Sequence, residues 1–312
     1  MAEIARNYIE VRANQKLSKL VETNIALLEL EALITLKQYE SGYASLLNYE
    51  TIQASLATER SMLPDLKAQI HRGIYTLSIL TGDVPEALVE EMIVYQPIPK
   101  PPKKVSVGVR SDLLRRRPDV RQSERQLAAA TANVGVAVAS FFPSILLYGV
   151  GGFQSVLFKN LFTSGSKFWA FGGNVDIPIF EAGKLVGNLK ANQAAAAAAA
   201  CSYHQTVLTA LEETESSLVS YAEDIAATSQ LRSAVESERI LVQLTKDRNV
   251  KGLVSAPNLI ESERQLNAAE QSLVKSEMNS LIDLITLYKA LGGGWEAEEE
   301  EKIETRKLSD IP

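Results

Sequence analysis

Residues 142–183 read FPSILLYGVGGFQSVLFKNLFTSGSKFWAFGGNVDIPIFEAG, and this stretch decides the fold of the chain. Within it, residues 169–180 alternate between apolar and small or polar side chains, which is the period of a β-strand. One predicted face carries Trp169, Phe171, Val175, Ile177 and Ile179, and the other carries Ala170, Gly172, Asn174 and Asp176. Such a strand suits a membrane barrel with lipid outside and water inside. The alternation alone makes Asn174 and Asp176 candidates for the water-facing side.

The predicted partner strand is the run 144–156, which is rich in Ile, Leu, Tyr, Val and Gly. Together the two runs predict a β-hairpin within residues 144–180. The alternative is a soluble two-stranded hairpin packed against helices. Because an isolated hairpin is only marginally stable, both interpretations require partners, either from this chain or from other copies of it.

The composition argues against several classes of protein. With 312 residues, of which 46% are hydrophobic and 22% charged, the chain is long enough to fold and is not a disordered polymer. Its net charge of −6 argues against a nucleic-acid binder. No uncharged apolar stretch reaches the ~18 residues of a membrane-spanning helix. The single cysteine, Cys201, is predicted to be a free, buried thiol.

Helical sequence lies on both sides of the hairpin. Gly42 interrupts the first helical region, and a Gly-then-Pro stop at residues 82–85 ends it. Pro118 suits the first position of a helix that runs through residues 121–140. The predicted parts are a helical region at 1–90, a Pro-rich linker at 91–111, a second helical region containing the hairpin at 112–295, and an acidic disordered tail at 296–312.

A shift of 210 residues, without a gap, lays the first helical region on the last. Matched pairs include Thr35 with Thr245, Gly42 with Gly252, Ser45 with Ser255, Leu56 with Leu266, and Gly82 with Gly292. Both segments also repeat apolar residues every seven positions, which is typical of a coiled-coil seam. The predicted long helices at 184–220 and 225–291 are expected to form an antiparallel hairpin whose turn, or tip, is Tyr221–Asp224.

The sequence resembles the outer membrane factors of bacterial tripartite efflux systems, a family of TolC-like channels. Within that family it resembles the NodT-type lipoproteins. The stretches that carry the resemblance are LLRRRPDVRQSERQLAAATANVGVAVASFFPSILLYG at 113–149, PIFEAGKLVGNL at 178–189, VLTALEETESSLVSY at 207–221, LIESERQLNAAEQSLVKSE at 259–277 and LYKALGGGW at 287–295. They belong to a likeness that covers essentially residues 5–295.

The resemblance implies a mainly α fold, with long antiparallel coiled-coil hairpins and one β-hairpin that contributes to a trimeric outer-membrane β-barrel. The implied function is a passive exit duct for small solutes or drugs. The implied partners are two further copies of the chain, a periplasmic adaptor protein, an inner-membrane pump and outer-membrane lipid. The family implies no cofactor, no metal and no enzymatic activity.

The start of the sequence departs from the family pattern. Family members begin with a signal peptide, a lipidated cysteine and the strand pair of the first repeat, whereas this chain opens MAEIARNYIEVRANQKL. The predicted tip at Tyr221 maps back to Val11 in the repeat register. We therefore expect an N-terminally truncated member. The alternatives to a working duct are a truncated, non-functional remnant and a soluble coiled-coil protein.

Acidic residues near the predicted tip are the candidates for a tunnel gate. The resemblance implies a constriction formed by inward acidic side chains, and three copies would bring like charges onto one axis. The acidic position of the family falls at Ser216, beside Glu215. The gate candidates are Glu215, Glu223 and Asp224, with Glu212 and Glu213 close by in the sequence. The alternative is an ordinary solvated helix face.

No catalytic pattern is present in the sequence. His71 and His204 each lie alone on a predicted helix, without a local partner motif for a metal site or general base. The arginines at 115–117 are predicted to tie the start of the following helix to carboxylates on neighbouring helices, rather than to bind phosphate.

Overall fold

The computed structural model describes residues 1–102 and 117–293. The predicted acidic tail at 296–312 and the second half of the predicted linker lie outside these residues, as do Arg115 and Arg116. The chain forms two compact units, one from residues 1–116 and 211–312 and the other from residues 117–210. We refer to them as the helical unit and the hairpin unit.

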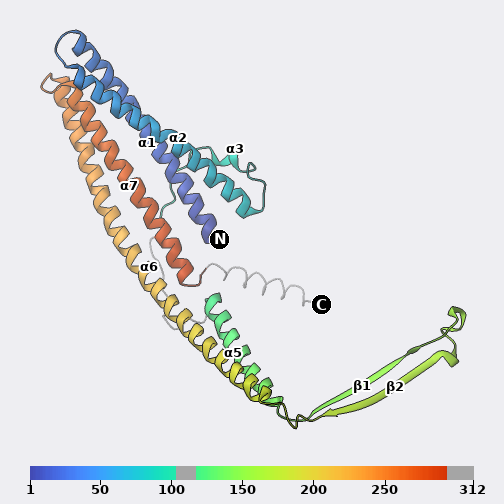
Figure 1. Cartoon of the computed structure of the whole chain (residues 1–312). Helices are drawn as coiled ribbons and strands as arrows, with labels where there is room; N and C mark the ends of the chain where they lie inside the picture. The colour runs from blue at the N-terminus through green and yellow to red at the C-terminus, as the bar shows by residue number, and fades with distance from the viewer. Residues whose placement is uncertain (103–116, 294–312) are drawn as a thin grey trace, which may run out of the picture. The chain divides into compact units, whose positions relative to one another are not determined.

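Two helical hairpins build the helical unit (Figure 1). The first joins α1 (Ala2–Glu40) to α2 (Leu46–Thr81), and the short helix α3 (Val89–Met92) follows it. The predicted break at Gly42 is confirmed, since Gly42 adopts a φ of 76°, which side chains with a Cβ disfavour. Ser45 then caps α2, and its hydroxyl accepts a hydrogen bond from the Asn48 amide at 3.3 Å.

The second hairpin joins the C-terminal part of α6 (Lys184–Val250) to α7 (Ala256–Ala290). The predicted turn at Tyr221–Asp224 is wrong, because α6 continues through these residues without a break. That tetrapeptide contains neither Gly nor Pro, so nothing in it stops a helix. The turn lies at residues 251–255, where Gly252 has a φ of 71° and Ser255 is the N-cap of α7.

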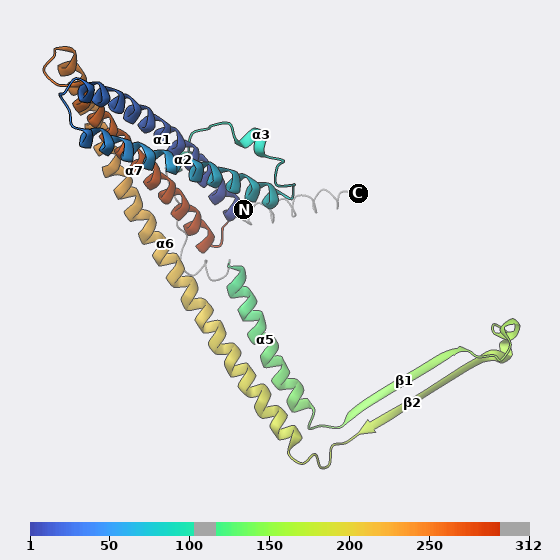
Figure 2. The same cartoon turned by 45° about the horizontal axis from the view of Figure 1, so that its top comes forward.

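The 210-residue repeat is visible in the positions of the helix ends. Helix α1 ends at Glu40 and α6 at Val250, while α2 begins at Leu46 and α7 at Ala256. The four matched glycines at 42, 252, 82 and 292 all have positive φ. In this register Val11, which we expected to mark a tip, lies inside α1. The turns at 41–45 and 251–255 are therefore equivalent, and both lie at the same end of the helical unit (Figures 1 and 2).

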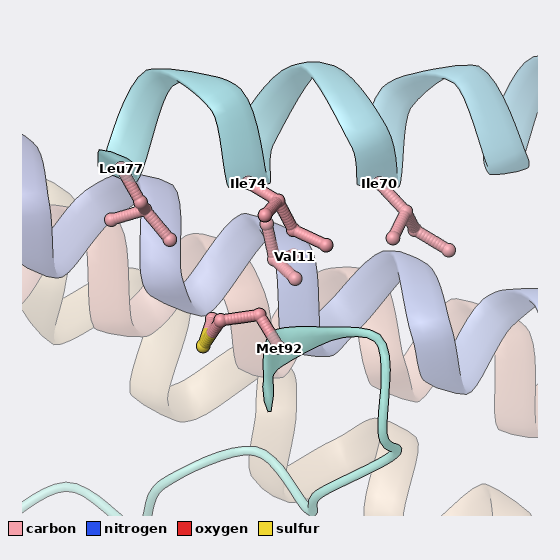
Figure 3. Close-up of a cluster of buried hydrophobic side chains, with 5 residues drawn as sticks. All are labelled: Val11, Ile70, Ile74, Leu77 and Met92. Carbon is pink, nitrogen blue, oxygen red and sulfur yellow. The ribbon is translucent and has the colours of Figure 1, made fainter. Parts of the chain in front are cut away.

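The core of the helical unit consists of small clusters along the helix seams. In the first, Val11 of α1 meets Ile70, Ile74 and Leu77 of α2, and Met92 of α3 closes the cluster (Figure 3). A second cluster joins α1 to α7. It consists of Ala13, Leu17, Leu20 and Val274. Helix α1 therefore packs against α2, its partner in the first hairpin, and also against α7 of the second hairpin.

The close contact between α1 and α2 depends on Gly73, because a glycine has no side chain. A Cβ placed there would lie 2.5 Å from Cγ2 of Val11, which is closer than packed carbons tolerate. We expect Gly73→Ala to lower the free energy of unfolding by about 1–3 kcal/mol, the usual cost of overpacking a core. Gly135→Ala in helix α5 (Pro118–Ala139) is the matched control, since nothing lies within 4 Å of its added Cβ. The control should gain about 0.5–1 kcal/mol from better helix propensity, and thermal unfolding measures both changes.

The hairpin unit contains α5, strand β1 (Ser144–Phe153), strand β2 (Lys167–Asp176) and the first part of α6. Two short 3₁₀ turns, Phe158–Asn160 and Ser164–Ser166, lie in the loop between the strands. The prediction that Pro118 occupies the first turn of α5 is confirmed.

The predicted β-hairpin is confirmed, with shifted boundaries. The strands pair antiparallel, with Ser144 opposite Asp176, Tyr148 opposite Gly172, and Phe153 opposite Lys167. Strand β2 begins two residues before the predicted Trp169 and ends at Asp176, so Ile177 and Ile179 lie beyond the ladder. Pro178 has no amide hydrogen to donate, which explains why strand pairing does not continue through the predicted end.

Candidate functional site

One face of the β-hairpin is almost entirely apolar. Trp169, Phe171 and Val175 of β2 share this face with Ile145 and Leu147 of β1, which pair with Val175 and Gly173. The rings of Trp169 and Phe171 stack at a centroid distance of 5.9 Å, and the partners opposite these two residues are glycines. Phe171 is 79% exposed and Leu147 is 80% exposed. The face therefore presents large side chains that the helices do not cover.

The opposite face mixes polar and apolar side chains, and Leu146 and Phe168 lie on it. Tyr148 lies over Gly172, where an added Cβ would come within 2.7 Å of the Tyr148 ring carbon Cζ. Asn174 pairs with Leu146 and Asp176 with Ser144, and all four are exposed. The two residues predicted to face water therefore share one side of the ladder. Their place inside a barrel stays a prediction.

Within its own unit, no helix covers the hairpin. Every residue of β1 and β2 is exposed except Gly152 and Gly172, which are half-buried. The alternative of a hairpin packed against helices is not seen within this unit. Among the described helices, none has an apolar stretch long enough to cross a lipid bilayer. An uncovered apolar surface of this kind marks an interaction site.

The acidic gate candidates lie in the middle of α6. Glu215 and Asp224 are half-buried, while Glu223 is exposed, as are Glu212 and Glu213. Roughly 40 Å of helix separates Asp224 from the end of α6. The premise that these residues surround a tip is wrong, because the turn lies at 251–255. Whether any of them narrows a tunnel stays a prediction.

One gate candidate has a partner that the sequence did not indicate. Asp224 interacts with Asp283 of α7, a second half-buried carboxylate. Burial raises the pKa of Asp283, and the charge and hydrogen bond of Asp224 raise it further. About one helical turn before Asp224, Tyr221 of α6 forms an apolar cluster with Leu284, Leu287 and Leu291. Burial also raises the pKa of Tyr221.

Opposite charges join α6 to α7 farther along the same interface. Arg232 pairs with Glu277 at 2.8 Å, and Arg239 pairs with Glu270 at 2.8 Å. Between these pairs and the aspartates, the hydroxyls of Thr228 and Ser276 lie 2.7 Å apart. The polar contacts thus form a ladder along the two helices, in which only the Asp224–Asp283 rung among those described here brings like charges together.

The two turns at the end of the helical unit expose apolar side chains. We call residues 41–47 and 250–255 the tip loops. Tyr43 is 88% exposed in the first and Leu253 is 72% exposed in the second, and these two positions match in the repeat register. Leu47 and Val250 add further exposed apolar surface. The sequence signal for this surface was the match of Gly42 with Gly252, which locates both turns.

The remaining candidate residues form no reactive site. The Nδ1 atom of His71 is buried and has no hydrogen-bond partner, and His204 is exposed. Across residues 1–102 and 117–293, no three His, Cys, Asp or Glu side chains are grouped to hold a metal ion. Cys201 is exposed, so the prediction of a buried thiol is wrong; its Ala-rich stretch of α6 has no covering element in this part of the chain.

Arg117 pairs with a carboxylate in the first turn of its own helix, whereas the prediction was a carboxylate on a neighbouring helix. Its Nη2 and Nε atoms donate to the two oxygens of Asp119 at 2.7 and 3.1 Å. These hydrogen bonds lower the pKa of the Asp119 carboxyl. The ion pair thereby stabilises the start of α5, at the N-terminus where a negative charge is favourable.

Comparison with known proteins identifies a matching family and similar proteins. A family model described as outer membrane efflux protein matches residues 109–293. The toluene efflux pump outer membrane protein TtgF of Pseudomonas putida is 30% identical over 95% of this chain and 61% of that protein. Nodulation protein T of Rhizobium leguminosarum is 28% identical with the same two coverages. This chain therefore spans about three fifths of the length of these curated relatives.

Solved structures share the fold. The outer-membrane channel OprN matches with a TM-score of 0.80 and 30% identity, over 94% of this chain and 66% of that one. The family match covers more than half of the residues, and it includes α5, both strands, α6 and α7. The chain belongs to the outer membrane efflux protein family.

Proposed function

We propose that this chain is a subunit of an exit duct for small solutes or drugs in the outer membrane. The observation that carries the proposal is the uncovered hairpin, whose apolar face holds Trp169 and Phe171. A lone pair of strands leaves unpaired backbone groups at its edges, and a bilayer does not tolerate such edges. The hairpin therefore requires further strands as partners, and a closed barrel satisfies every edge.

The partner copies are proposed to be two further subunits, giving a homotrimer. Apolar side chains on the outside of both helical hairpins support this, since nothing in the described chain buries them. They are Leu30, Leu33, Met62, Tyr75, Ile79, Val219, Ile225, Ile240, Leu241 and Leu244. A second copy of the same hairpins is the natural cover for such stripes, because a coiled-coil surface is complementary to another helix.

The tip loops are the proposed contact for a periplasmic adaptor protein that connects the duct to an inner-membrane pump. The two tip loops lie at the same end of the helical unit (Figure 1). Exposed Tyr43 and Leu253 occupy matched positions of the two repeats within them. In cells that carry the cognate pump, a Leu47→Glu, Leu253→Glu double variant should lose export while its trimer stays intact. Normal export by that variant would exclude the tip loops as the contact.

The duct is tested by reconstituting the full chain into lipid vesicles. Trp169 and Trp295 are its two tryptophans, so Trp295→Phe leaves Trp169 as the sole reporter. Brominated acyl chains should quench Trp169, cross-linking should give trimers, and a small dye trapped in the vesicles should escape. Quenching without trimers or dye release would indicate a membrane-bound remnant, and an unquenched, unassociated chain would indicate a soluble coiled-coil protein; either result overturns the proposal.

The proposed duct is passive and assigns no reaction to the chain. It needs no cofactor, because passage through a water-filled channel requires only a continuous polar path. Asn174 and Asp176 are the proposed water-facing residues of the barrel. Glu215, Glu223 and Asp224 stay candidates for the polar lining of the tunnel in the middle of α6, away from the tip loops.

A further inference from the structure

The loop between the two strands uses its polar side chains to bind its own backbone. We call residues 154–166, which join β1 to β2, the hairpin loop. The hydroxyls of Thr163 and Ser166 both donate to the carbonyl oxygen of Asn160. The Gln154 amide donates to the carbonyl oxygen of Ser166 at 2.7 Å, which closes the loop. The loop is therefore ordered by hydrogen bonds made within itself.

The apolar side chains of the hairpin loop point outward instead. Phe162 touches Phe153 edge-on, with ring centroids 5.5 Å apart, and still remains 76% exposed. Val156 and Phe158 are almost fully exposed, and Leu157 is half exposed. An exposed apolar patch of this kind marks a surface that contacts a membrane or another protein.

The charges of this part of the chain are all positive and lie at one end of the hairpin. From residue 126 to residue 175 the sequence contains no acidic side chain, and its basic side chains are Lys159 and Lys167. Both are exposed, although the whole chain has a net charge of −6. Lys159 lies in the hairpin loop, and Lys167 pairs with Phe153 on the last rung of the ladder. Neither forms an ion pair within the described residues.

The length of the strands fixes the depth of the loop if the hairpin crosses a bilayer, as the proposed duct requires. Each strand has ten residues. At ~3.3 Å per residue, ten residues extend about 33 Å. The hydrocarbon core of a bilayer is about 30 Å thick, and a membrane strand needs about 9–11 residues to cross it. The hairpin loop would then lie among the lipid headgroups of one leaflet.

We propose that the hairpin loop binds the anionic headgroups of that leaflet. Its apolar side chains enter the edge of the hydrocarbon, while Lys159 and Lys167 extend outward and donate N–H hydrogen bonds to lipid phosphate oxygens. The backbone groups that the loop pairs internally need no water there, so the cost of leaving water is reduced. This inference rests on the proposed duct and adds the chemistry of the lipid that one end of its barrel recognises.

Contact between the loops of neighbouring copies is the competing explanation for the apolar surface. The charges argue against it, because three copies would bring six lysine side chains toward one axis without any acidic partner in the loops. Lipid phosphates supply the opposite charge at the depth where both lysines lie. The observations therefore favour lipid as the occupant.

The test places the sole tryptophan of the full chain in the loop, by Trp169→Phe, Trp295→Phe and Phe158→Trp. This chain is reconstituted into vesicles of phosphatidylcholine and phosphatidylglycerol whose acyl chains carry bromine near the headgroup. The reporter at residue 158 should be quenched. The ratio of quenched to unquenched reporter should decrease about five-fold for each lysine replaced by Lys159→Gln or Lys167→Gln, the usual contribution of a lysine at an anionic surface. Without phosphatidylglycerol, the variants should differ little from the starting chain.

The matched control is the double variant Lys184→Gln, Lys190→Gln, which removes the same charge from α6, beyond the other end of β2. Its reporter should be quenched as in the starting chain. The proposal is overturned if residue 158 stays unquenched while Trp169, in its own reporter chain, is quenched and trimers form. It is also overturned if the lysine variants behave like the control.

Two further outcomes separate this proposal from its alternatives. Disulfide cross-links between copies through Phe158→Cys in a Cys201→Ser chain, without quenching at residue 158, would identify loop-to-loop contact and overturn the lipid contact. If neither Trp169 nor the reporter at residue 158 is quenched, the hairpin does not enter the bilayer, and the proposed duct and the lipid contact are both overturned.

Discussion

Replacing Arg12 with methionine is expected to lower the free energy of unfolding of the helical unit by about 2–4 kcal/mol, as for other buried polar groups whose partners are left unsatisfied. Arg12 lies on α1, is 2% exposed, and is among the largest fully buried side chains of the described residues. Methionine fills much of the space of the arginine stem, so the change removes the charge and the donors more than the packing.

The physical reason is the set of acceptors around the guanidinium. Its Nη1 atom donates to the Val94 carbonyl oxygen at 2.7 Å, the Met92 carbonyl oxygen at 3.1 Å and the Gln15 amide oxygen at 3.0 Å. The Tyr8 ring lies 5.0 Å away, which adds a cation–π contact. Gln15 also donates to Met92 at 2.7 Å, so the methionine variant mainly strands the Val94 carbonyl.

Chemical denaturation followed by circular dichroism measures this loss. The matched control is Arg6→Met on the same helix, which breaks an exposed ion pair with Glu10 and should cost only about 0.3–0.5 kcal/mol. An equal, small loss in both variants would mean that the guanidinium does not hold the 92–94 segment. Increased proteolysis near residues 92–94 in the Arg12 variant alone would localise the effect.

Phe171→Arg is expected to abolish assembly of the proposed duct in vesicles. Phe171 is exposed on the apolar face of β2, beside Trp169. An arginine on the lipid face of a membrane strand costs about 2–4 kcal/mol near the middle of the bilayer. In a trimer this cost arises three times, which exceeds what a marginally stable assembly can absorb.

Asn174→Arg provides the matched control, because it introduces the same side chain three residues away on the opposite face. If that face lines water, the control should still give cross-linked trimers, quenching of Trp169 and dye release. Loss of assembly in both variants would contradict the placement of Asn174 and Asp176 in a lumen. Normal assembly of the Phe171 variant would contradict the lipid-facing role of the apolar face.

Several local features of the structure were predictable from the sequence. The alternation in residues 169–180 predicted a strand, which ends at Asp176 in the structure. Pro118 predicted the start of α5, and the matched Gly42 and Gly252 marked equivalent turns. Each signal depends on residues within a few positions of one another, or on a direct repeat. The family resemblance and the mainly helical fold were predictable for the same reason. The turn predicted at Tyr221–Asp224 does not form because these residues include no helix breaker, whereas Gly252 lies in the turn that follows α6.

Only the tertiary structure decided which distant side chains meet. Arg12 bonds to residues some eighty positions away, and Asp224 meets Asp283 across a turn of the chain. Both contacts depend on the register of two packed helices, which short-range patterns do not specify. Burial likewise depends on packing, since Cys201 and the strand faces are exposed because no element of their own unit covers them. Local patterns in the sequence were sufficient to predict most elements and their repeat, while packing determined the charge pairs and the exposed surfaces.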